Sequence, residues 1–322
     1  MGEELPPLEP QSRKFAEQMR GSSMPPAHET PYEKSRAAMA ASAILLSGPR
    51  TDVYRTEDRS IDGPGGALTI RIYWPRALQD GEKIGGVLFL HGGGFYLGNV
   101  ETHDVVARDL CRDAGVIVVS VDYRRAPEHR FPAAVEDCHA ALCWLAGHGH
   151  EIGVDRDRIG VCGDSSGGTL TVTTCLLARD HQGPKISCQV VVYGLLTLQD
   201  ALHLPSRAQF GNGEYFGSLK DLEYVRNLYL ADPDRDMDNP LASPLLAGNL
   251  GALPPALVVT AGYDMVRDDN RYYADQLRGA DVPVEYKCYA DTLHPFYLFA
   301  GLLDVGRDAR RFVADYVRRM LA

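Results

Sequence analysis

The stretch "RIGVCGDSSGGTL", residues 158–170, places two serines inside a run of glycines. A serine hydroxyl becomes a nucleophile when a base takes its proton and a tight turn exposes its oxygen. The strand-to-helix turn that does this has the pattern Gly-x-Ser-x-Gly, because only glycine can flank the strained serine closely. Gly163 and Gly167 flank Ser165 in this pattern. Ser166 would need glycine at position 164, which is aspartate, so we expect Ser165 to be the nucleophile.

The segments around this motif support a strand-turn-helix setting. The apolar run Ile159–Cys162 leads into it, and a helical pattern over Thr169–Ala178 follows it. A trypsin-like protease also carries Gly-Asp-Ser-Gly-Gly, but its histidine and aspartate precede the serine and its strands form β-barrels. The order of elements here favours an α/β-hydrolase turn over the protease.

The candidate base is a histidine that follows the nucleophile, because the chain order in this fold is serine, acid, histidine. Only His181, His203 and His294 follow Ser165. The first lies at a predicted helix end and the second in a predicted insertion. His294 comes after the strand-like run Val284–Tyr289, at a position where an α/β sheet places its site.

The candidate acid is Asp264, which follows the strand-like run Leu257–Thr260 through a turn at Gly262. Asp268 remains the alternative. Asp268 and Asp269 also qualify as N-cap residues of the helix predicted next, over Asn270–Arg278.

A second glycine motif, "FLHGGGFYLG" at residues 89–98, comes directly after an apolar strand-like run. Successive glycines let the main chain approach a substrate, so that N–H groups can point at a developing oxyanion. Such a loop some seventy residues before a nucleophile turn is a specific signal. Phe95 and Tyr96 beside it are pocket-wall candidates, with burial in the core as the alternative.

The elements that must position these residues alternate along the chain. Apolar runs, which we expect to be buried strands, occupy Val87–Leu90, Val116–Val121, Ile159–Cys162, Val190–Val192 and Leu257–Thr260. Helical periodicity occupies Ala133–Gly147, Thr169–Ala178, Asn270–Arg278 and Val305–Leu321. The alternation predicts the α/β class, with a mostly parallel sheet covered by helices on both faces. Ala67–Trp74 alternates apolar and polar residues and is expected as an antiparallel edge strand.

Two segments interrupt the alternation, and we expect them to form a helical cap. Residues 1–50 contain a Pro-rich opening and a predicted helix over Tyr32–Leu46, and residues 195–231 form an insertion of the size of a lid. The hydrolase core is then divided into residues 51–194 and 232–322. The insertion adds three further candidates for substrate binding: Phe210, Tyr215 and Phe216.

The composition excludes several functions. A net charge of −10 argues against a nucleic-acid partner, because phosphates require clustered Lys and Arg. The acidic, Pro-rich start lacks a secretory signal pattern, and no apolar run is long enough for a membrane span. The seven cysteines show no Cys-x-x-Cys spacing, so we expect reduced thiols in a cytoplasmic protein, with no metal site.

Together these motifs resemble the hormone-sensitive-lipase family of α/β-hydrolase esterases. The matching segments are His91–Phe95, Tyr123–His129, Gly163–Gly168, Asp264–Asp268 and His294, spread over most of the chain from residue 86 onward. The resemblance implies a capped serine carboxylesterase for short- to medium-chain acyl esters, which needs no metal or cofactor. Its only implied partner is a small-molecule ester; a homo-oligomer is left open.

Carried over by motif, the roles are a catalytic triad of Ser165, Asp264 and His294 and an oxyanion hole made by the N–H groups of Gly93, Gly94 and Ser166. His91 is expected to brace the glycine loop. Pro295 departs from the glycine that the family usually has there, and Ser166 replaces the commoner alanine. The Ser166 side chain is therefore expected to be dispensable.

Two other functions remain open at this point. An amidase or deacetylase would use the same scaffold, since sequence does not separate the leaving groups. A non-catalytic small-molecule receptor is the other alternative, although such receptors typically lack a triad residue.

Overall fold

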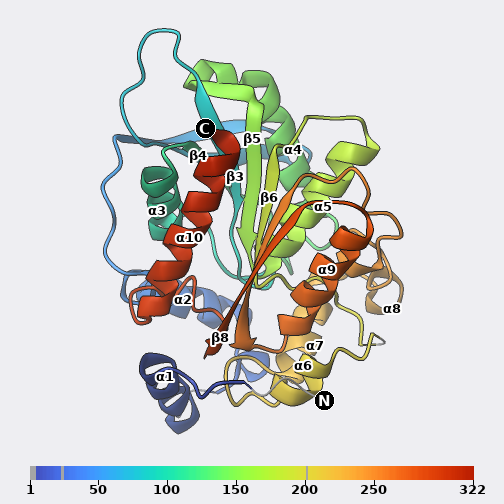
Figure 1. Ribbon diagram of the computed structural model, residues 1–322. Coiled ribbons are helices and arrows are strands. Elements are labelled where there is room, and N and C mark those ends of the chain that lie inside the picture. The colour runs from blue at the N-terminus through green and yellow to red at the C-terminus, as the bar shows by residue number, and fades with distance from the viewer. Residues whose placement is uncertain (1–4, 23–24, 201) are drawn as a thin grey trace.

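The computed structural model describes residues 5–22, 25–200 and 202–322, and its centre is an eight-stranded sheet (Figure 1). The strand order is β1-β2-β4-β3-β5-β6-β7-β8. The strands are β1 (Arg55–Gly63), β2 (Gly66–Trp74), β3 (Ile84–Leu90), β4 (Ile117–Asp122), β5 (Val154–Asp164), β6 (Cys188–Val192), β7 (Ala256–Tyr263) and β8 (Val284–Leu293). Three parts of the predicted cap, residues 1–4, residues 23–24 and Ala201, lie outside the described residues.

The sheet is mostly parallel, which confirms the predicted fold class. β2 pairs antiparallel with both β1 and β4, and the pairs from β4 through β3 to β8 are parallel. The prediction that Ala67–Trp74 is antiparallel is confirmed, but its place at the edge is wrong. β1 lies outside it. The sequence of β1, "RTEDRSIDG", is charged along most of its length and shows no apolar run.

Helices cover both faces of the sheet. α3 and α10 pack together on one face, and α4, α5 and α9 cover the other (Figure 1). Their bounds are α3 (Asp104–Ala114), α4 (Ala133–His148), α5 (Ser166–Asp180), α9 (Arg267–Gly279) and α10 (Asp304–Leu321). The four predicted helices of the core are confirmed, and α3 was not predicted. In the described ranges no helix has the length and apolar composition required to cross a membrane.

One local expectation about α9 is wrong. Its N-cap is Val266, so Asp268 and Asp269 lie within the first turn rather than at the cap. Both side chains are buried, because they bind the segment that follows residue 203 instead of solvent.

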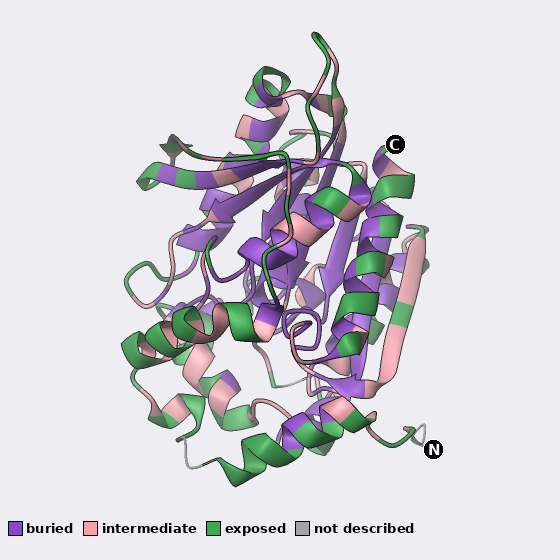
Figure 2. Cartoon of the chain, turned by 90° about the vertical axis from the view of Figure 1, so that its left-hand side faces the viewer, coloured by how far each residue is buried: buried purple, intermediate pink, exposed green. Residues whose placement is uncertain are grey.

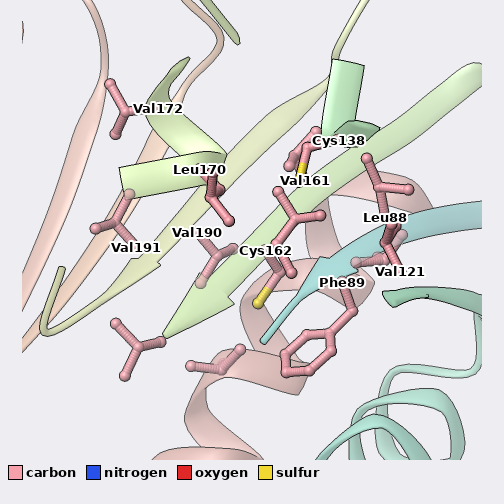
Figure 3. Packing of buried hydrophobic residues seen from close by; sticks show 14 of the residues in the cluster. Leu88, Phe89, Val121, Cys138, Val161, Cys162, Leu170, Val172, Val190 and Val191 are labelled. Atoms are coloured by element: carbon pink, nitrogen blue, oxygen red, sulfur yellow. The ribbon is translucent and has the colours of Figure 1, made fainter. Parts of the chain in front are cut away.

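The core is built from the apolar strands, as Figure 3 shows for Leu88, Val161 and Val190, which have no exposed surface. Figure 2 shows buried residues concentrated in the sheet and on the helix faces that touch it. Burying one such side chain stabilises the fold by about 1.5–3 kcal/mol. The strands therefore provide a rigid base for the loops that follow them.

The helices of the N-terminal segment and the insertion gather below the sheet in Figure 1. They are α1 (Pro10–Gly21), the short η1 (Ala27–Glu29), α2 (Tyr32–Ser47), α6 (Pro205–Phe210) and α7 (Leu219–Tyr229). α8 (Pro233–Asp236) lies beside the core, and two further short helices, η2 (Gly149–Ile152) and η3 (Pro244–Leu246), follow α4 and precede β7. The two segments predicted as a cap contact each other. His28 Nδ1 lies 2.7 Å from Asp221 Oδ1, and the Tyr224 hydroxyl donates to the Thr30 carbonyl at 3.2 Å.

Arg310 of α10 joins three distant parts of the chain. Its guanidinium donates to the carbonyls of Tyr297, Leu298 and Ser47 at 2.9–3.0 Å and to Asp109 Oδ2 at 2.8 Å. The side chain is only 4% exposed. A buried guanidinium with this many partners fixes both the end of α2 and the loop that follows β8.

We expect Arg310→Leu to lower the free energy of unfolding by about 3–5 kcal/mol, because Asp109 and three carbonyls lose their buried partner. Arg311→Leu is the matched control, since Arg311 is exposed and pairs with Asp308 at the surface. Its effect should stay within about 0.5 kcal/mol. Urea unfolding measures both, and equal losses in the two variants would contradict this account.

Candidate active site

Ser165 lies at the sharp turn between β5 and α5. Its backbone has φ 54° and ψ −120°, a strained conformation for a residue with a side chain. The close approach around it explains the flanking glycines. A Cβ at Gly167 would lie 2.0 Å from the Leu90 carbonyl oxygen, and one at Gly163 would lie 2.2 Å from the Gly167 oxygen. The Gly-x-Ser-x-Gly spacing is thus a steric requirement of this turn.

His294 and Asp264 meet at the ends of β8 and β7. His294 Nδ1 is 2.8 Å from Asp264 Oδ2, and the other carboxylate oxygen of Asp264 accepts from the Val266 N–H at 3.0 Å. Asp264 is 2% exposed. The alternative acid, Asp268, accepts instead from the Ser206 N–H at 2.8 Å. Of the two aspartates, the structure places Asp264 beside the histidine. The peptide bond before Pro295 is cis.

Tyr193, at the end of β6, connects the serine and the histidine. The Ser165 N–H donates to Val192 O at 2.9 Å, and the Leu195 N–H donates to Ser165 O at 3.1 Å, so Ser165 lies beside Tyr193. The Tyr193 and His294 ring centroids are 4.3 Å apart. Burial raises the pKa of the Tyr193 phenol, so the ring packs as a neutral wall behind the imidazole.

Sequence reasoning did not predict Tyr193 as a site residue. Its position directly after the apolar run Val190–Val192, at the same sheet edge as the other candidates, was the available signal.

The glycine loop after β3 presents free amides. Gly93 and Gly94 have φ values of 119° and 59°, and the Gly93 carbonyl accepts from the Leu97 N–H at 2.8 Å, which curls the loop. Within the described part of the chain, the N–H groups of Gly93, Gly94 and Ser166 donate to no protein acceptor. Unpaired amides next to a nucleophile turn can bind a negatively charged oxygen.

His91 braces the start of this loop, in agreement with the role expected for it. Its Nδ1 lies 2.8 Å from the Gly92 carbonyl, and its ring stacks on Tyr123 with centroids 4.2 Å apart. The imidazole is fully buried, and this burial lowers its pKa well below the usual value. His91 is therefore neutral at pH 7.

Arg36 of α2 holds the other end of the loop, and sequence reasoning missed it. Its Nε donates to Tyr96 O at 2.7 Å, and its Nη2 donates to Ala126 O at 2.7 Å. Glu128 receives two further hydrogen bonds from the guanidinium, at 2.6 and 2.8 Å. The hydrogen bonds from Arg36 lower the pKa of the Glu128 carboxyl to about 2. The charged segment Tyr123–His129 thus supports the loop rather than reacting.

The insertion is attached to the loop that carries Asp264. Arg207 of α6 donates to Asp269 Oδ1 at 2.7 Å, and the Ser206 hydroxyl donates to Met265 O at 2.9 Å. Asp269 is completely buried, and this burial raises its pKa to about 6 in spite of Arg207. Asp268 and Asp269 therefore anchor α6, which explains why neither reaches His294.

The five aromatic residues predicted to bind substrate occupy different environments. Phe216 stacks on His294, with ring centroids 5.8 Å apart and planes inclined by 22°. Phe210 and Tyr215 pack instead against each other and against Tyr263, with centroids 4.9–5.6 Å apart. The other two rings lie against α7. Phe95 is fully buried and stacks on Tyr229, and Tyr96 meets Tyr224 edge to face.

The mostly parallel sheet, the strained serine turn and the histidine-carboxylate pair together define an α/β-hydrolase. Comparisons with known proteins agree. Residues 87–298 match the model of a protein family described by its alpha/beta hydrolase fold. Esterase LipI of Mycobacterium tuberculosis is 41% identical over 266 residues, which cover 81% of this chain and 82% of LipI.

Two further relatives have the same class of activity in their names. The acetyl esterase of Salmonella agona is 32% identical over 259 residues, or 79% of this chain and 77% of that protein. The solved structure of a hyperthermophilic esterase from Pyrobaculum calidifontis has a TM-score of 0.92 and 37% identity, and the match covers 98% of this chain and 99% of the other. The chain belongs to the α/β-hydrolase family and is a carboxylic ester hydrolase of the hormone-sensitive-lipase-like group.

We expect Phe216→Ala to lower kcat for ester hydrolysis about three- to tenfold, because the His294 ring loses the aromatic face that restrains it. Tyr215→Ala is the matched control, since the neighbouring ring packs on Tyr263. It should change kcat less than twofold. Steady-state kinetics with p-nitrophenyl butyrate compare the two variants. A kcat of Phe216→Ala within twofold of wild type would contradict this role of the stacked ring.

Proposed function

We propose that the protein is a serine carboxylesterase that hydrolyses short- to medium-chain acyl esters through an acyl-enzyme. Ser165 is the nucleophile, His294 the general base and Asp264 the residue that orients it. The observation that carries the proposal is the 2.8 Å contact between His294 Nδ1 and Asp264 Oδ2, because it fixes the tautomer. With the Nδ1 proton held by the carboxylate, Nε2 has a lone pair for the serine proton.

In the first half of the reaction, His294 Nε2 removes the Ser165 hydroxyl proton while Oγ forms a bond to the ester carbonyl carbon. The carbonyl oxygen becomes negatively charged in the tetrahedral intermediate. His294 then gives its proton to the alcohol oxygen as the ester C–O bond breaks. The alcohol leaves, and the acyl group remains on Ser165.

The N–H groups of Gly93, Gly94 and Ser166 stabilise the negative oxygen. The free amides on the glycine loop and at the first residue of α5 support this role. Each such donor lowers the activation free energy by about 3–4 kcal/mol in related chemistry. Because the loop is held by His91 and Arg36, little reorganisation is needed when the charge develops.

In the second half, water replaces the alcohol. His294 takes a proton from water as its oxygen attacks the acyl carbon, and the same proton returns to Ser165 Oγ when the acid is released. Every proton and electron pair in the cycle is accounted for by the substrate, water and the three side chains. We therefore assign no role to a metal or a cofactor.

The preference for short and medium acyl chains rests on the residues around the base. Phe216 lies against His294 and comes from the predicted cap segment 195–231, so an aromatic wall limits the space beside the reacting serine. The name of the Salmonella relative, an acetyl esterase, supports the same preference. We assign residues 1–50 and 195–231 together to this cap, because His28 and Asp221 join them.

We expect Ser165→Ala to lower kcat on p-nitrophenyl acetate and butyrate by at least about 10⁴-fold, because no other group can form the acyl-enzyme. Release of nitrophenol by the purified full chain is the measurement. Equal release by wild type and Ser165→Ala would refute the proposed function. An unchanged unfolding midpoint shows that the variant is folded.

The two aspartates give a separate test of the acid. Asp264→Asn should lower kcat about 10³- to 10⁴-fold, because the amide favours the wrong imidazole tautomer. Asp268→Asn is the matched control, since its oxygen can still accept the Ser206 N–H. It should retain kcat within about threefold. If Asp268→Asn were the more damaging change in the same nitrophenyl assay, the assignment of Asp264 would be wrong.

A further inference from the structure

The two residues that flank Ser165 both bind the glycine loop through their side chains. Asp164 Oδ1 accepts from the Gly92 N–H at 3.0 Å, and Ser166 Oγ accepts from the Phe95 N–H at 3.2 Å. These two bonds lie on either side of the Gly93-Gly94 pair. The nucleophile and the loop opposite it are thus joined by direct bonds from the neighbours of Ser165.

The Ser166 hydroxyl lies in a buried part of the site. Ser166 has no exposed surface, and Tyr123 is 1% exposed. The Tyr123 phenol donates to the His91 carbonyl at 2.7 Å, and His91 directly precedes the loop. The loop is therefore held at Phe95 by Ser166 and at its start by Tyr123.

Phe95 needs this acceptor because its conformation is unusual. It has φ 64°, in the left-handed region that residues other than glycine seldom adopt. Its carbonyl accepts from the Ala126 N–H at 3.0 Å, and its ring is held by stacking on Tyr229. Without the Ser166 oxygen, the buried Phe95 N–H would lack its partner, and a buried unpaired donor is costly. The loop would then relax at the residue next to Gly94.

We propose that the Ser166 hydroxyl is a positioning residue that sets the distance between the Gly93 and Gly94 amides and the Ser165 oxygen. It acts through Phe95 and does not touch the substrate. The inference rests on the proposed function, because it concerns the oxyanion hole of that reaction. It reverses the expectation from sequence that the Ser166 side chain is dispensable and that only its amide matters.

The test compares Ser166→Ala with Thr171→Val in the full chain. Thr171 lies on the same helix, is equally buried, and its hydroxyl donates to Gly167 O at 2.9 Å. Both variants lose one buried hydroxyl of α5, but only Ser166 binds the glycine loop. The kinetics of p-nitrophenyl butyrate hydrolysis and the inhibition constant of an alkyl trifluoromethyl ketone are measured. The ketone adds the Ser165 oxygen to its carbonyl carbon and so forms an oxyanion.

Ser166→Ala is expected to lower kcat about tenfold with KM unchanged within twofold, because a displaced donor weakens binding of the oxyanion more than of the substrate. The inhibition constant of the ketone should rise about tenfold. Thr171→Val should leave both values within twofold of wild type. If Ser166→Ala keeps the wild-type kcat and inhibition constant, or if both variants lose activity equally, the inference is overturned.

Ser166→Cys gives a second variant that keeps a weak acceptor of similar size. Its kcat should lie between those of wild type and Ser166→Ala, and a kcat no higher than that of Ser166→Ala contradicts the proposal. Failure of the proposed function is distinguishable, because it appears as activity in Ser165→Ala. An inactive Ser165→Ala together with a fully active Ser166→Ala would overturn this inference alone.

Discussion

The rest of the structure depends on the close contact between the end of β3 and the turn that follows β5. The two strands are neighbours in the sheet, with Leu90 paired to Gly163, and the Leu90 carbonyl leaves no room for a side chain at Gly167. Since the chain enters the glycine loop directly after Leu90, this contact brings the loop amides to the turn that carries Ser165. Parallel pairing of apolar strands thus creates the spacing on which the proposed chemistry depends.

Buried or half-buried arginines hold the loops that the strands alone cannot position. Arg310 binds the carbonyls after His294, Arg207 binds Asp269 next to the loop of Asp264, and Arg36 binds the carbonyl of Tyr96. A planar guanidinium can satisfy several acceptors in fixed directions, which suits irregular backbone better than an ammonium does. The site therefore lies on loops that are restrained from behind, which agrees with the preorganisation that oxyanion stabilisation requires.

Much of the fold and part of the site could be predicted from the sequence. The buried strands are continuous apolar runs, and the glycine spacing around Ser165 follows from local sterics, so both leave clear patterns. β1 leaves none, because it pairs on one side only and most of its side chains are charged. The choice between Asp264 and Asp268 needed three-dimensional contacts, since both follow β7. Tyr193 and Arg36 act through partners 60 to 105 residues away, which spacing along the chain does not reveal.

The contacts of α2 and α7 with the glycine loop limit how this protein can change in evolution or in the laboratory. Arg36 binds Tyr96, the ring of Tyr229 stacks on Phe95, and a Cβ on Gly94 would meet Val225 at 3.1 Å. A shortened chain that begins at β1 would lose an arginine that two buried carbonyls need. Under the proposed function, exchanging Phe216 is a route to new substrate preferences, whereas replacing α2 or α7 as a whole would alter the glycine loop itself.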